Sequence, residues 1–513
     1  MSLNLATMLT ESAKKDPGHT AIIFENFKMT YGELNAASNK VANALVRAGI
    51  ERDQKVAILI PNIPQFLMCY FGILKTGAVV VPLNVLLRGP EIAYHLQDSD
   101  SVMLIAWEGF VADAVAGYQQ TPTCKKLVII NAPGSTALPD VEGALRFDAF
   151  LADTSPKFEM VATMPDDTAV IIYTSGTTGQ PKGAELTHFN LLFNARIAAT
   201  TLGIEWLPDD VALVALPLFH SFGLSAVMGV AVTVGATMTL MPRFDPLKAF
   251  EIIQRDHVTT FSGVPTMYIY MLNHPERKKY DLSSLRFCNS GGASLPVEIL
   301  EAWKREFGIT ILEGYGLSET SPVASSNVLY KPAKPGTVGI PIWGIEMKIV
   351  DDQDHDLPVG EIGEIVIRGH NIMKGYYKRP EATAEAIHNG WFHTGDIGKM
   401  DEDGYFSIVD RKKDMIIRGG FNVYPRELEE VLYAHPAIAE AAVIGVPDPQ
   451  LGEEVKAIIY LKPGATATEE EIRGYCKARL AGYKYPRIIR FIDQPLPKNA
   501  TGKILKRELR NMA

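Results

Sequence analysis

Residues 173–188 read YTSGTTGQPKGAELTH, a stretch that combines hydroxyl side chains, glycines and one lysine. The apolar, β-branched run Thr168–Tyr173 precedes it, and a helix-cap pattern at Thr187 follows it. We therefore expect a strand, a loop and a helix. Glycine amides, hydroxyls and a lysine can bind phosphate oxygens, which makes polyphosphate binding the leading hypothesis. The candidate residues are Thr174, Ser175, Gly176, Thr177, Thr178, Gly179 and Lys182.

This stretch does not have the spacing of a Walker A loop, G-x-x-x-x-G-K-[ST]. A solvated surface loop rich in serine, threonine and glycine is the alternative interpretation. The loop on its own does not decide between the two, so further motifs are needed.

Helical and strand patterns alternate on both sides of this loop. Helix-like Glu33–Ala48 is followed by apolar strands at Val56–Ile60, Val79–Leu83 and Leu127–Ile130, which is typical of α/β layers. Short strands and Gly/Pro turns after Gly336 predict a small β-rich subdomain. The last hundred or so residues predict a separate α+β domain. We expect an α/β fold, with domains at residues 1–411 and 412–513.

Composition excludes several classes of protein. A length of 513 residues exceeds the size of single cores, so at least two domains are expected. The net charge of −9 argues against a nucleic-acid partner. The cysteines are scattered without C-x-x-C spacing, which fits a reducing compartment, and we expect a cytoplasmic protein. Uncharged Phe222–Met241 is long enough to span a membrane, but its glycines and its β-like end favour a buried helix running into a strand.

Four more motifs follow in order along the chain. They are EGYGLSET at Glu313–Thr320, Gly395-Asp396 within GWFHTGD, DRKKD at Asp410–Asp414 and PKNATGK at Pro497–Lys503. Together with the first loop they resemble the adenylate-forming superfamily of acyl-CoA synthetases, peptide-synthetase adenylation domains and luciferases. The wording is closest to bacterial medium- and long-chain fatty-acyl-CoA ligases. This resemblance implies a large N-terminal domain with several subdomains and a small mobile C-terminal domain.

The resemblance also implies a reaction in two steps. A carboxylic acid and ATP give an acyl-adenylate and pyrophosphate, and coenzyme A then takes the acyl group and releases AMP. ATP and coenzyme A would be co-substrates, and Mg²⁺ would be held by Thr174 and Glu319, since hard oxygen ligands suit this ion. Tyr315 would stack on adenine, and Asp396 with Arg411 would bind the ribose. The other implied nucleotide contacts are Gly292, Ala293, Glu313, Gly314, Gly316 and Ser318.

Three segments of the C-terminal region receive roles from the same resemblance. Lys503 would bridge the substrate carboxylate and the α-phosphate during the first step. Lys413 aligns with the hinge of the rotating domain. Arg418, Gly419 and Gly420 would line the coenzyme A site after rotation. Without the resemblance each cation would be interpreted as an ordinary solvated side chain.

The stretch after Pro217 would select the acid. His220 would orient the carboxyl group, and an apolar tunnel for an alkyl chain would be lined by Phe222, Leu224, Val227, Met228 and Gly292. No acidic residue lies between Val211 and Phe244, which argues against an amino-acid substrate. These apolar side chains could equally be ordinary core.

Several alternatives to a fatty acid:CoA ligase stay open at this point. They are an aryl or phenylpropanoid acid:CoA ligase, an acyl-AMP ligase that loads a carrier protein, a luciferase-like oxygenase and a nucleotide-binding scaffold without catalysis. A homodimer and a peripheral association with membranes are further possibilities.

Overall fold

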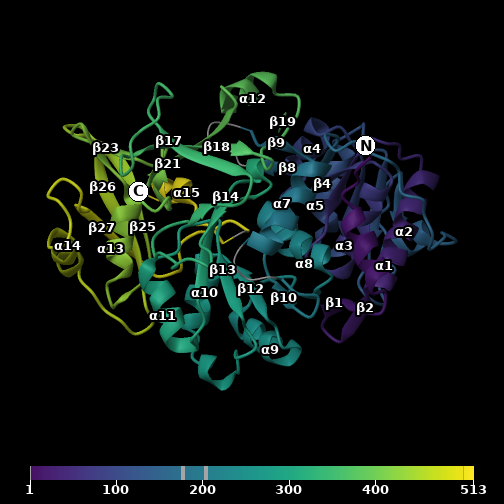
Figure 1. Ribbon diagram of the computed structural model, residues 1–513, viewed down its shortest axis with the longest axis horizontal. Coiled ribbons are helices and arrows are strands. Elements are labelled where there is room, and N and C mark those ends of the chain that lie inside the picture. The colour runs from purple at the N-terminus through teal and green to yellow at the C-terminus, as the bar shows by residue number, and fades with distance from the viewer. Residues whose placement is uncertain (1, 175–179, 202–205, 501, 513) are drawn as a thin grey trace.

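The computed structural model describes residues 2–174, 180–201, 206–500 and 502–512. These residues form four β-sheets, and helices pack against them (Figure 1). The expected α/β class, with a large N-terminal part and a small C-terminal part, is confirmed. The predicted boundary between residues 411 and 412 stays a prediction.

The first large sheet has the order β19-β9-β8-β4-β3-β5-β6-β7, and its central strands are parallel and buried on both faces. The strands are β3 (Lys55–Leu59), β4 (Val79–Pro82), β5 (Ser101–Trp107), β6 (Lys126–Ile130), β7 (Ala144–Arg146), β8 (Thr168–Thr174), β9 (Lys182–Thr187) and β19 (Gly375–Tyr376). The helices of this region are α2 (Tyr31–Arg47), α3 (Pro64–Lys75), α4 (Gly89–Asp98), α5 (Val111–Gln119) and α6 (Phe147–Leu151). A capping box between Thr30 and Glu33 begins α2, close to where the sequence predicted it.

The second large sheet has the order β16-β15-β14-β13-β12-β10-β11-β1-β2. The strands are β1 (Thr20–Phe24), β2 (Phe27–Thr30), β10 (Val211–Val214), β11 (Thr237–Leu240), β12 (Thr260–Gly263), β13 (Phe287–Ser290), β14 (Ile311–Gly316), β15 (Val323–Ser326) and β16 (Ile340–Pro341). Its helices are α1 (Thr7–Lys15), α7 (His188–Thr201), α8 (Val230–Val234), α9 (Pro246–Asp256), α10 (Pro265–Leu272) and α11 (Val297–Phe307). Because β12, β13 and β14 are parallel, their carboxyl ends meet at one edge of the sheet.

The uncharged segment Phe222–Met241 is folded into the protein. It forms a π-helix over Phe222–Gly229, then α8, then β11, as the sequence predicted. No helix among the described residues is long and apolar enough to cross a membrane.

The loop after β8 differs from the sequence prediction in one respect. The chain does not pass directly from the loop into a helix, because β9 pairs with β8 in an antiparallel hairpin before α7 begins. In β9 the apolar side chains of Ala184 and Leu186 are fully buried, which is the alternation of a strand. The prediction of a strand, loop and helix was therefore incomplete.

A smaller sheet follows, with β17 (Ile345–Val350), β18 (Gly363–Gly369), β20 (Ile387–His388), β21 (Trp391–Met400) and β22 (Phe406–Arg411), and α12 (Pro380–Ala386) lies beside it. The C-terminal sheet has the order β24-β23-β26-β25, and β27 pairs with β26. Its elements are β23 (Ile416–Arg418), β24 (Phe421–Val423), β25 (Ile438–Asp448), β26 (Gly452–Leu461), β27 (Ile488–Ile492), α13 (Pro425–Tyr433), α14 (Glu469–Lys477) and α15 (Lys506–Asn511). This sheet has hydrophobic clusters of its own.

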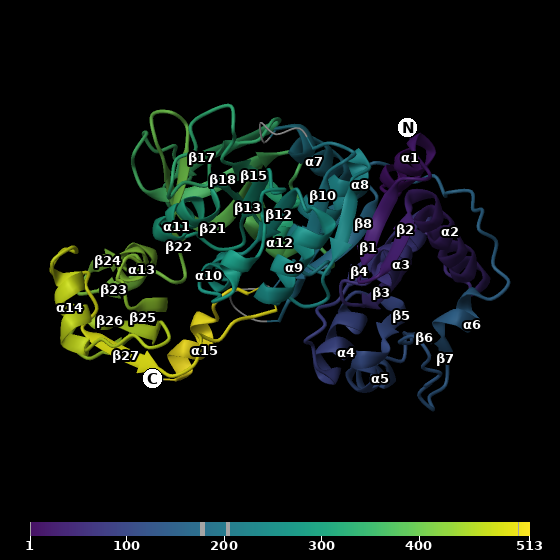
Figure 2. The same cartoon turned by 90° about the horizontal axis from the view of Figure 1, so that it is seen from below.

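Individual hydrogen bonds connect the C-terminal part to the rest of the chain. Glu430 of α13 accepts a hydrogen bond of 3.3 Å from the backbone N–H of Val297. Lys498 donates to the hydroxyl of Tyr270 at 2.9 Å. Figure 2 shows the C-terminal segment, in yellow, reaching from the small sheet toward the larger part of the molecule. This segment carries Lys503.

Candidate active site

The phosphate-loop hairpin ends at the cross-strand pair Thr174 and Lys182. Residues 175–179 of the predicted phosphate contacts, which are Ser175, Gly176, Thr177, Thr178 and Gly179, lie outside the described residues. The Nζ atom of Lys182 lies 5.0 Å from the ring centre of Tyr376, a residue of β19, the strand that pairs with β9. The β8–β9 hairpin is therefore bordered by β19.

Tyr376 connects this hairpin to Glu319. Its hydroxyl donates a 2.9 Å hydrogen bond to Oε1 of Glu319, and the Glu319 carbonyl accepts from the backbone N–H of Met373 at 2.9 Å. Glu319 is 8% exposed. A buried carboxylate with one oxygen held by the hydroxyl of Tyr376, whose ring lies beside Lys182, presents hard oxygen donors that fit Mg²⁺.

A second cluster joins β14 to the small sheet. Asp396 of β21 accepts a 2.6 Å hydrogen bond from the Tyr315 hydroxyl and lies 2.9 Å from Nε of Arg411. Asp396 and Arg411 are cross-strand partners in the β21–β22 ladder. Asp396 is only 2% exposed. The three residues predicted to contact adenosine therefore interact with one another, because Asp396 binds both Tyr315 and Arg411.

The glycines around Tyr315 have a steric role that the structure shows directly. A Cβ atom on Gly316 would lie 1.7 Å from the carbonyl oxygen of Pro322, so no larger residue fits. Ser318 shares a hydrogen bond of 3.2 Å with Ser221, the residue after His220. The nucleotide segment and the predicted acyl segment are therefore in contact.

Lys503 reaches the same region from the C-terminal part. Burial and the positive charges of Arg411 and Lys413 lower the pKa of Lys503 to about 8, against the opposing effect of Asp396 and Asp414. The backbone N–H of Lys503 donates 2.9 Å to the side chain of Asn499, which holds the loop in shape.

His220 and the Lys503 loop are also linked. Burial, with a further contribution from the charge of Lys503, lowers the pKa of His220 to about 4, so the imidazole is neutral at pH 7. Thr266 donates 3.2 Å to the carbonyl of Gly502. Added Cβ atoms on Gly502 and Gly292 would lie 2.8 Å and 3.6 Å from Val264, so both glycines lie against this one side chain.

The predicted acyl residues divide into two groups. Phe222 is half-buried, and its ring lies 3.1 Å from the Cβ position of Gly291, next to Gly292. Leu224, Val227 and Met228 are each 1% exposed and belong to the main hydrophobic core. Their part in an acyl tunnel stays a prediction. The π-helix that carries them is a form found frequently at functional sites.

Glu313 and Ala293 lie at the edge of this arrangement. Ala293 is half-buried and follows the strand end of β13. Oε1 of Glu313 accepts 3.0 Å from the Leu295 backbone, while its other oxygen, Oε2, has no hydrogen-bond partner among the described residues. Burial raises the pKa of Glu313 to about 7, and Arg426 of α13 opposes that rise. Glu313 thus faces the C-terminal part, and its nucleotide contact stays a prediction.

The predicted coenzyme A contacts lie in the C-terminal sheet and are engaged there. Arg418 forms two hydrogen bonds with Glu454, of 2.6 and 2.8 Å. Gly419 and Gly420 have positive φ values of 56° and 82° at the β23–β24 turn. Lys413 lies between this turn and Arg411, and burial lowers its pKa. None of these residues is joined to Lys503 by a described hydrogen bond.

Two residues of the site were missed from sequence. Tyr376 lies in the stretch GYYKRP, and Thr266 is the second residue of α10. The aromatic pair in GYYKRP, next to basic residues, was a visible signal for the first. Thr266 acts through its hydroxyl on a backbone carbonyl 236 residues away in the chain, so no local pattern predicts its contact.

The chain matches known protein families over most of its length. The family described as "AMP-binding enzyme" matches residues 9–377, and "AMP-binding enzyme C-terminal domain" matches residues 427–503. The chain is 39% identical to a long-chain-fatty-acid–CoA ligase of Bacillus subtilis (strain 168), covering 98% of this chain and 94% of that protein. It is 40% identical to a feruloyl-CoA synthase of Amycolatopsis sp, covering 97% and 96%.

A solved structure shares the whole architecture. An anthranilate CoA ligase, AuaEII, in complex with anthranoyl-AMP superimposes with a TM-score of 0.93 at 31% identity, covering 100% of this chain and 98% of that one. The chain therefore belongs to the AMP-binding, adenylate-forming enzyme family. Within that family it is an AMP-forming acyl-CoA synthetase.

Proposed function

We propose that this enzyme is a fatty acid:CoA ligase for medium- to long-chain acids that works through an acyl-adenylate. The observation that carries this proposal is the position of Lys503. Its loop comes from the C-terminal part, yet Thr266 of α10 donates a 3.2 Å hydrogen bond to the Gly502 carbonyl, and the positive charge of Lys503 contributes to the lowered pKa of His220. A cation between an acyl segment and a nucleotide segment is suited to bring two anions together.

In the first step the acid attacks the α-phosphorus of ATP and pyrophosphate leaves. The protonated Lys503 would hold the carboxylate and the α-phosphate together and counter the charge that develops during transfer. His220, neutral at pH 7, would orient the carboxyl group without competing as a second cation. Tyr315 would stack on adenine, and Asp396 with Arg411 would hold the ribose.

Mg²⁺ would be held by Glu319 and Thr174, together with ATP. When bound, this ion neutralises phosphate charge and polarises the transferring group. Tyr376 donates a hydrogen bond to one oxygen of Glu319, and its ring centre lies 5.0 Å from Nζ of Lys182. Lys182 would contribute a further positive charge to the leaving phosphates.

In the second step the thiol of coenzyme A attacks the acyl carbon and AMP leaves. In this proposal Lys503 lies between the reactants during the first step, so the C-terminal part would have to move before the thiol enters. A rotation at Lys413 would withdraw Lys503 and bring in the Gly419-Gly420 turn. The lack of side chains at this turn leaves room for the pantetheine arm.

The apolar segment after Pro217 supports an alkyl substrate. Each methylene that it buries would contribute about 0.8 kcal/mol, so the affinity should rise with chain length until the tunnel is full. An aryl acid is the second candidate, because Leu224, Val227 and Met228 are packed in the core and a short planar acid needs less depth. The 40% identity to a feruloyl-CoA synthase supports the same candidate.

Mass spectrometry of the products decides between these substrates. The enzyme is incubated with ATP, Mg²⁺, coenzyme A and an equimolar mixture of C6 to C18 fatty acids, benzoate, cinnamate and ferulate. A ladder of fatty acyl-CoA products with one maximum supports the proposal, and the maximum measures the tunnel depth. Aryl-CoA as the main product would replace it with the second candidate, and acyl-AMP without any thioester would contradict both.

A further inference from the structure

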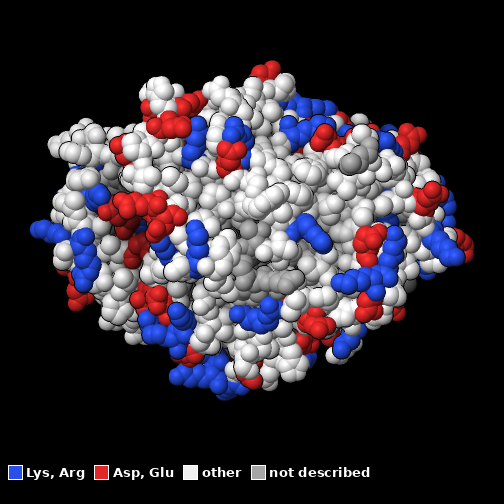
Figure 3. All heavy atoms as spheres, viewed as in Figure 1, with Lys and Arg blue, Asp and Glu red and all other residues white. Residues whose placement is uncertain are grey.

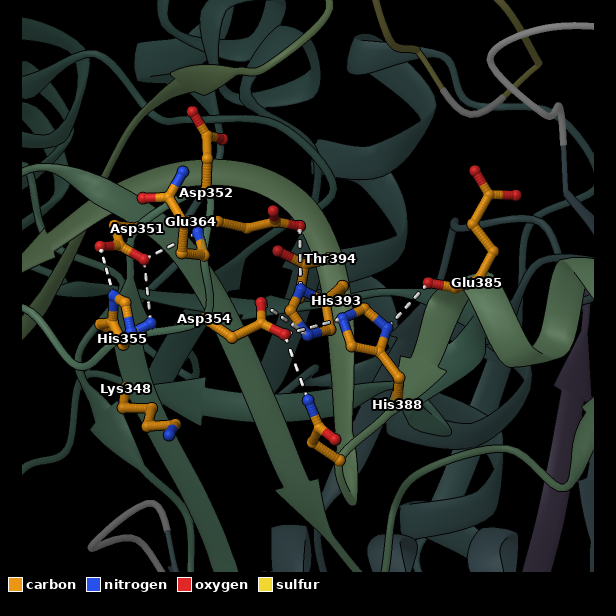
Figure 4. Close-up of polar contacts among 12 residues, drawn as sticks. Lys348, Asp351, Asp352, Asp354, His355, Glu364, Glu385, His388, His393 and Thr394 are labelled. Atoms are coloured by element: carbon orange, nitrogen blue, oxygen red, sulfur yellow. Dashed lines mark hydrogen bonds and ion pairs between the residues drawn. The ribbon is translucent and has the colours of Figure 1, made fainter.

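Three potential metal ligands meet on the small β-sheet, away from the groups described above. Asp354 lies in the loop between β17 and β18, His388 ends β20, and His393 lies on β21. Their ligand atoms all lie within 4.8 Å of one another. Figure 4 shows the Asp354 carboxylate directed at both imidazole rings.

The distances within this group are close to those of a coordination shell. Oδ2 of Asp354 lies 3.1 Å from Nε2 of His388, and Oδ1 lies 3.8 Å from Nε2 of His393. A tetrahedral ion with bonds of about 2.0–2.2 Å separates its ligand atoms by roughly 3.3 Å. The three ligand atoms are therefore close enough to share one ion once the imidazole rings turn so that their Nε2 atoms point at it.

The other nitrogen of each ring already faces an oxygen. Nδ1 of His388 lies 3.1 Å from the carbonyl of Glu385, and Nδ1 of His393 lies 3.8 Å from the carboxylate of Glu364. A carbonyl only accepts, so Nδ1 of His388 carries the proton. This is the arrangement that usually orients a metal-binding histidine, with Nε2 left for the ion.

The two imidazole rings are stacked on one another. Their centres are 3.8 Å apart, with an angle of 12° between the planes. Nearly parallel rings direct their in-plane Nε2 lone pairs side by side rather than toward one point. Binding of one ion by both Nε2 atoms therefore requires at least one ring to turn out of the stack.

We infer that Asp354, His388 and His393 form a binding site for a divalent transition-metal ion, with Zn²⁺ the best match. Two imidazoles and a carboxylate suit Zn²⁺, whereas Mg²⁺ prefers oxygen ligands only. The site is open to solvent, since Asp354 and His388 are about one-third exposed, so a water molecule can fill the fourth position. This ion is distinct from the Mg²⁺ expected with ATP.

The site is joined to the ribose-binding turn through one side chain. Glu364, which faces His393, accepts a 2.9 Å hydrogen bond from the backbone N–H of Gly395, next to Asp396. Its other oxygen lies 3.7 Å from Nζ of Lys412, beside the hinge residue Lys413. A bound ion would therefore pin the β17–β18 loop to the β20–β21 hairpin and hold Glu364 in place under the turn.

Calorimetric titration of the EDTA-treated full-length enzyme with Zn²⁺ tests the inference, and Co²⁺ serves as a spectroscopic probe. We expect one Zn²⁺ per chain and the visible absorption of four-coordinate Co²⁺. His388→Asn and Asp354→Asn should each weaken binding at least about 100-fold, and Glu364→Gln about 10-fold. Zn²⁺ should also raise the unfolding temperature of the wild type but not that of His388→Asn.

His355→Gln is the matched control. This histidine is a neighbour of Asp354, but it is 77% exposed and pairs with Asp351 instead. Its removal should change Zn²⁺ affinity by less than about 2-fold, the effect expected of a surface site. The inference is overturned if the wild type shows no saturable binding, if His388→Asn binds as well as the wild type, or if His355→Gln loses binding equally. Unfolding of each variant in EDTA verifies that it is folded.

Discussion

Two cationic segments of the C-terminal part are in opposite situations. The Lys503 loop is docked on the large N-terminal part, where Thr266 holds the Gly502 carbonyl and burial lowers the lysine pKa to about 8. The Arg418 turn is docked on its own sheet, where Nε and one Nη of the guanidinium donate to the two carboxylate oxygens of Glu454. The first segment contacts the N-terminal part, whereas the second is bound within the C-terminal sheet.

This difference teaches how one small domain can take part in two reactions. The loop proposed to serve adenylation is held by a hydrogen bond from the Thr266 side chain to the Gly502 carbonyl, which the proposed rotation would break. In the turn proposed to serve the thiol step, Arg418 would stay paired with Glu454 until a phosphate of coenzyme A replaces that carboxylate.

Figure 3 shows a face of the protein on which basic and acidic side chains lie mostly toward the rim, around a largely uncharged middle.

Lys503→Ala should produce the largest effect, because it removes the cation between the two anionic reactants. We expect adenylation, measured as pyrophosphate release, to fall about 10³-fold. Thioester formation from supplied acyl-adenylate and coenzyme A should stay within about 3-fold of the wild type, since Lys503 is withdrawn in that step.

Arg507→Ala is the control for that experiment, because Arg507 is an exposed cation on the same C-terminal segment. It should leave both steps unchanged. Equal losses in the two steps for Lys503→Ala would contradict the assignment of the two segments to separate reactions.

Gly502→Ala should weaken docking of the loop while Lys503 remains. A Cβ atom would lie 2.8 Å from both Thr266 and Val264, and the φ of +81° is unfavourable for alanine. We expect pyrophosphate release to fall about 30-fold, with thioester formation little changed, from a strain of about 2 kcal/mol. Gly464→Ala carries the same positive φ without neighbours within 4 Å, so it should leave adenylation unchanged. Equal adenylation in both variants would show that docking is not required.

Lys413→Pro should act on the exchange between the two states. Proline fixes φ and so restricts the backbone rotation at the proposed hinge. We expect the thioester step to slow about 10-fold while pyrophosphate release in a single turnover is nearly unchanged. Lys413→Ala removes the side chain but keeps the rotation, and it should behave like the wild type in both steps. A selective loss of adenylation in the proline variant would place the hinge elsewhere.

The pH dependence of adenylation should also reflect the loss of the proton from Lys503. Lys503 is cationic below its pKa of about 8 and loses its proton above it, so kcat/KM for pyrophosphate release should fall about tenfold per pH unit beyond that point. Bound anionic substrates raise the pKa of Lys503, so the decrease in kcat should begin at a higher pH than the decrease in kcat/KM. Lys503→Arg keeps a positive charge at all these pH values and should abolish the decrease in activity at high pH. A decrease that persists in this variant would come from the titration of another group.

Much of the fold was predictable from local patterns. The strands at Val79–Pro82 and Lys126–Ile130 are short apolar runs bounded by turns, and α2 is bounded by a capping box that the sequence displays. The order of strands in the sheets was not predictable, because β1 lies beside β11 through pairing across some 200 residues. The hairpin strand β9 was missed, since its glycine and charged residues resemble a loop.

The motifs name candidate site residues, but they do not predict the contacts between them. Motif order identified Tyr315, Asp396 and Arg411, yet only the β21–β22 register shows that Asp396 and Arg411 are already paired. The sequence also gave no sign that Arg418 is held by Glu454, because the partner lies 36 residues away on another strand. Contacts of this kind depend on tertiary geometry, which no local pattern encodes.

Glu454→Gln should have the smallest effect, and it tests directly whether the ion pair with Glu454 holds Arg418 until coenzyme A binds. The amide cannot maintain the charge-assisted pair, so releasing the guanidinium for a phosphate costs less, by about 0.7 kcal/mol. We expect the KM for coenzyme A to fall about 3-fold, with pyrophosphate release in the absence of coenzyme A unchanged. Glu346→Gln is the matched control, because Glu346 forms a similar pair with Arg368 on the other small sheet. An unchanged KM for coenzyme A would mean that Arg418 is a structural cation of the C-terminal sheet, and only the docked segment would then retain a role in the reaction.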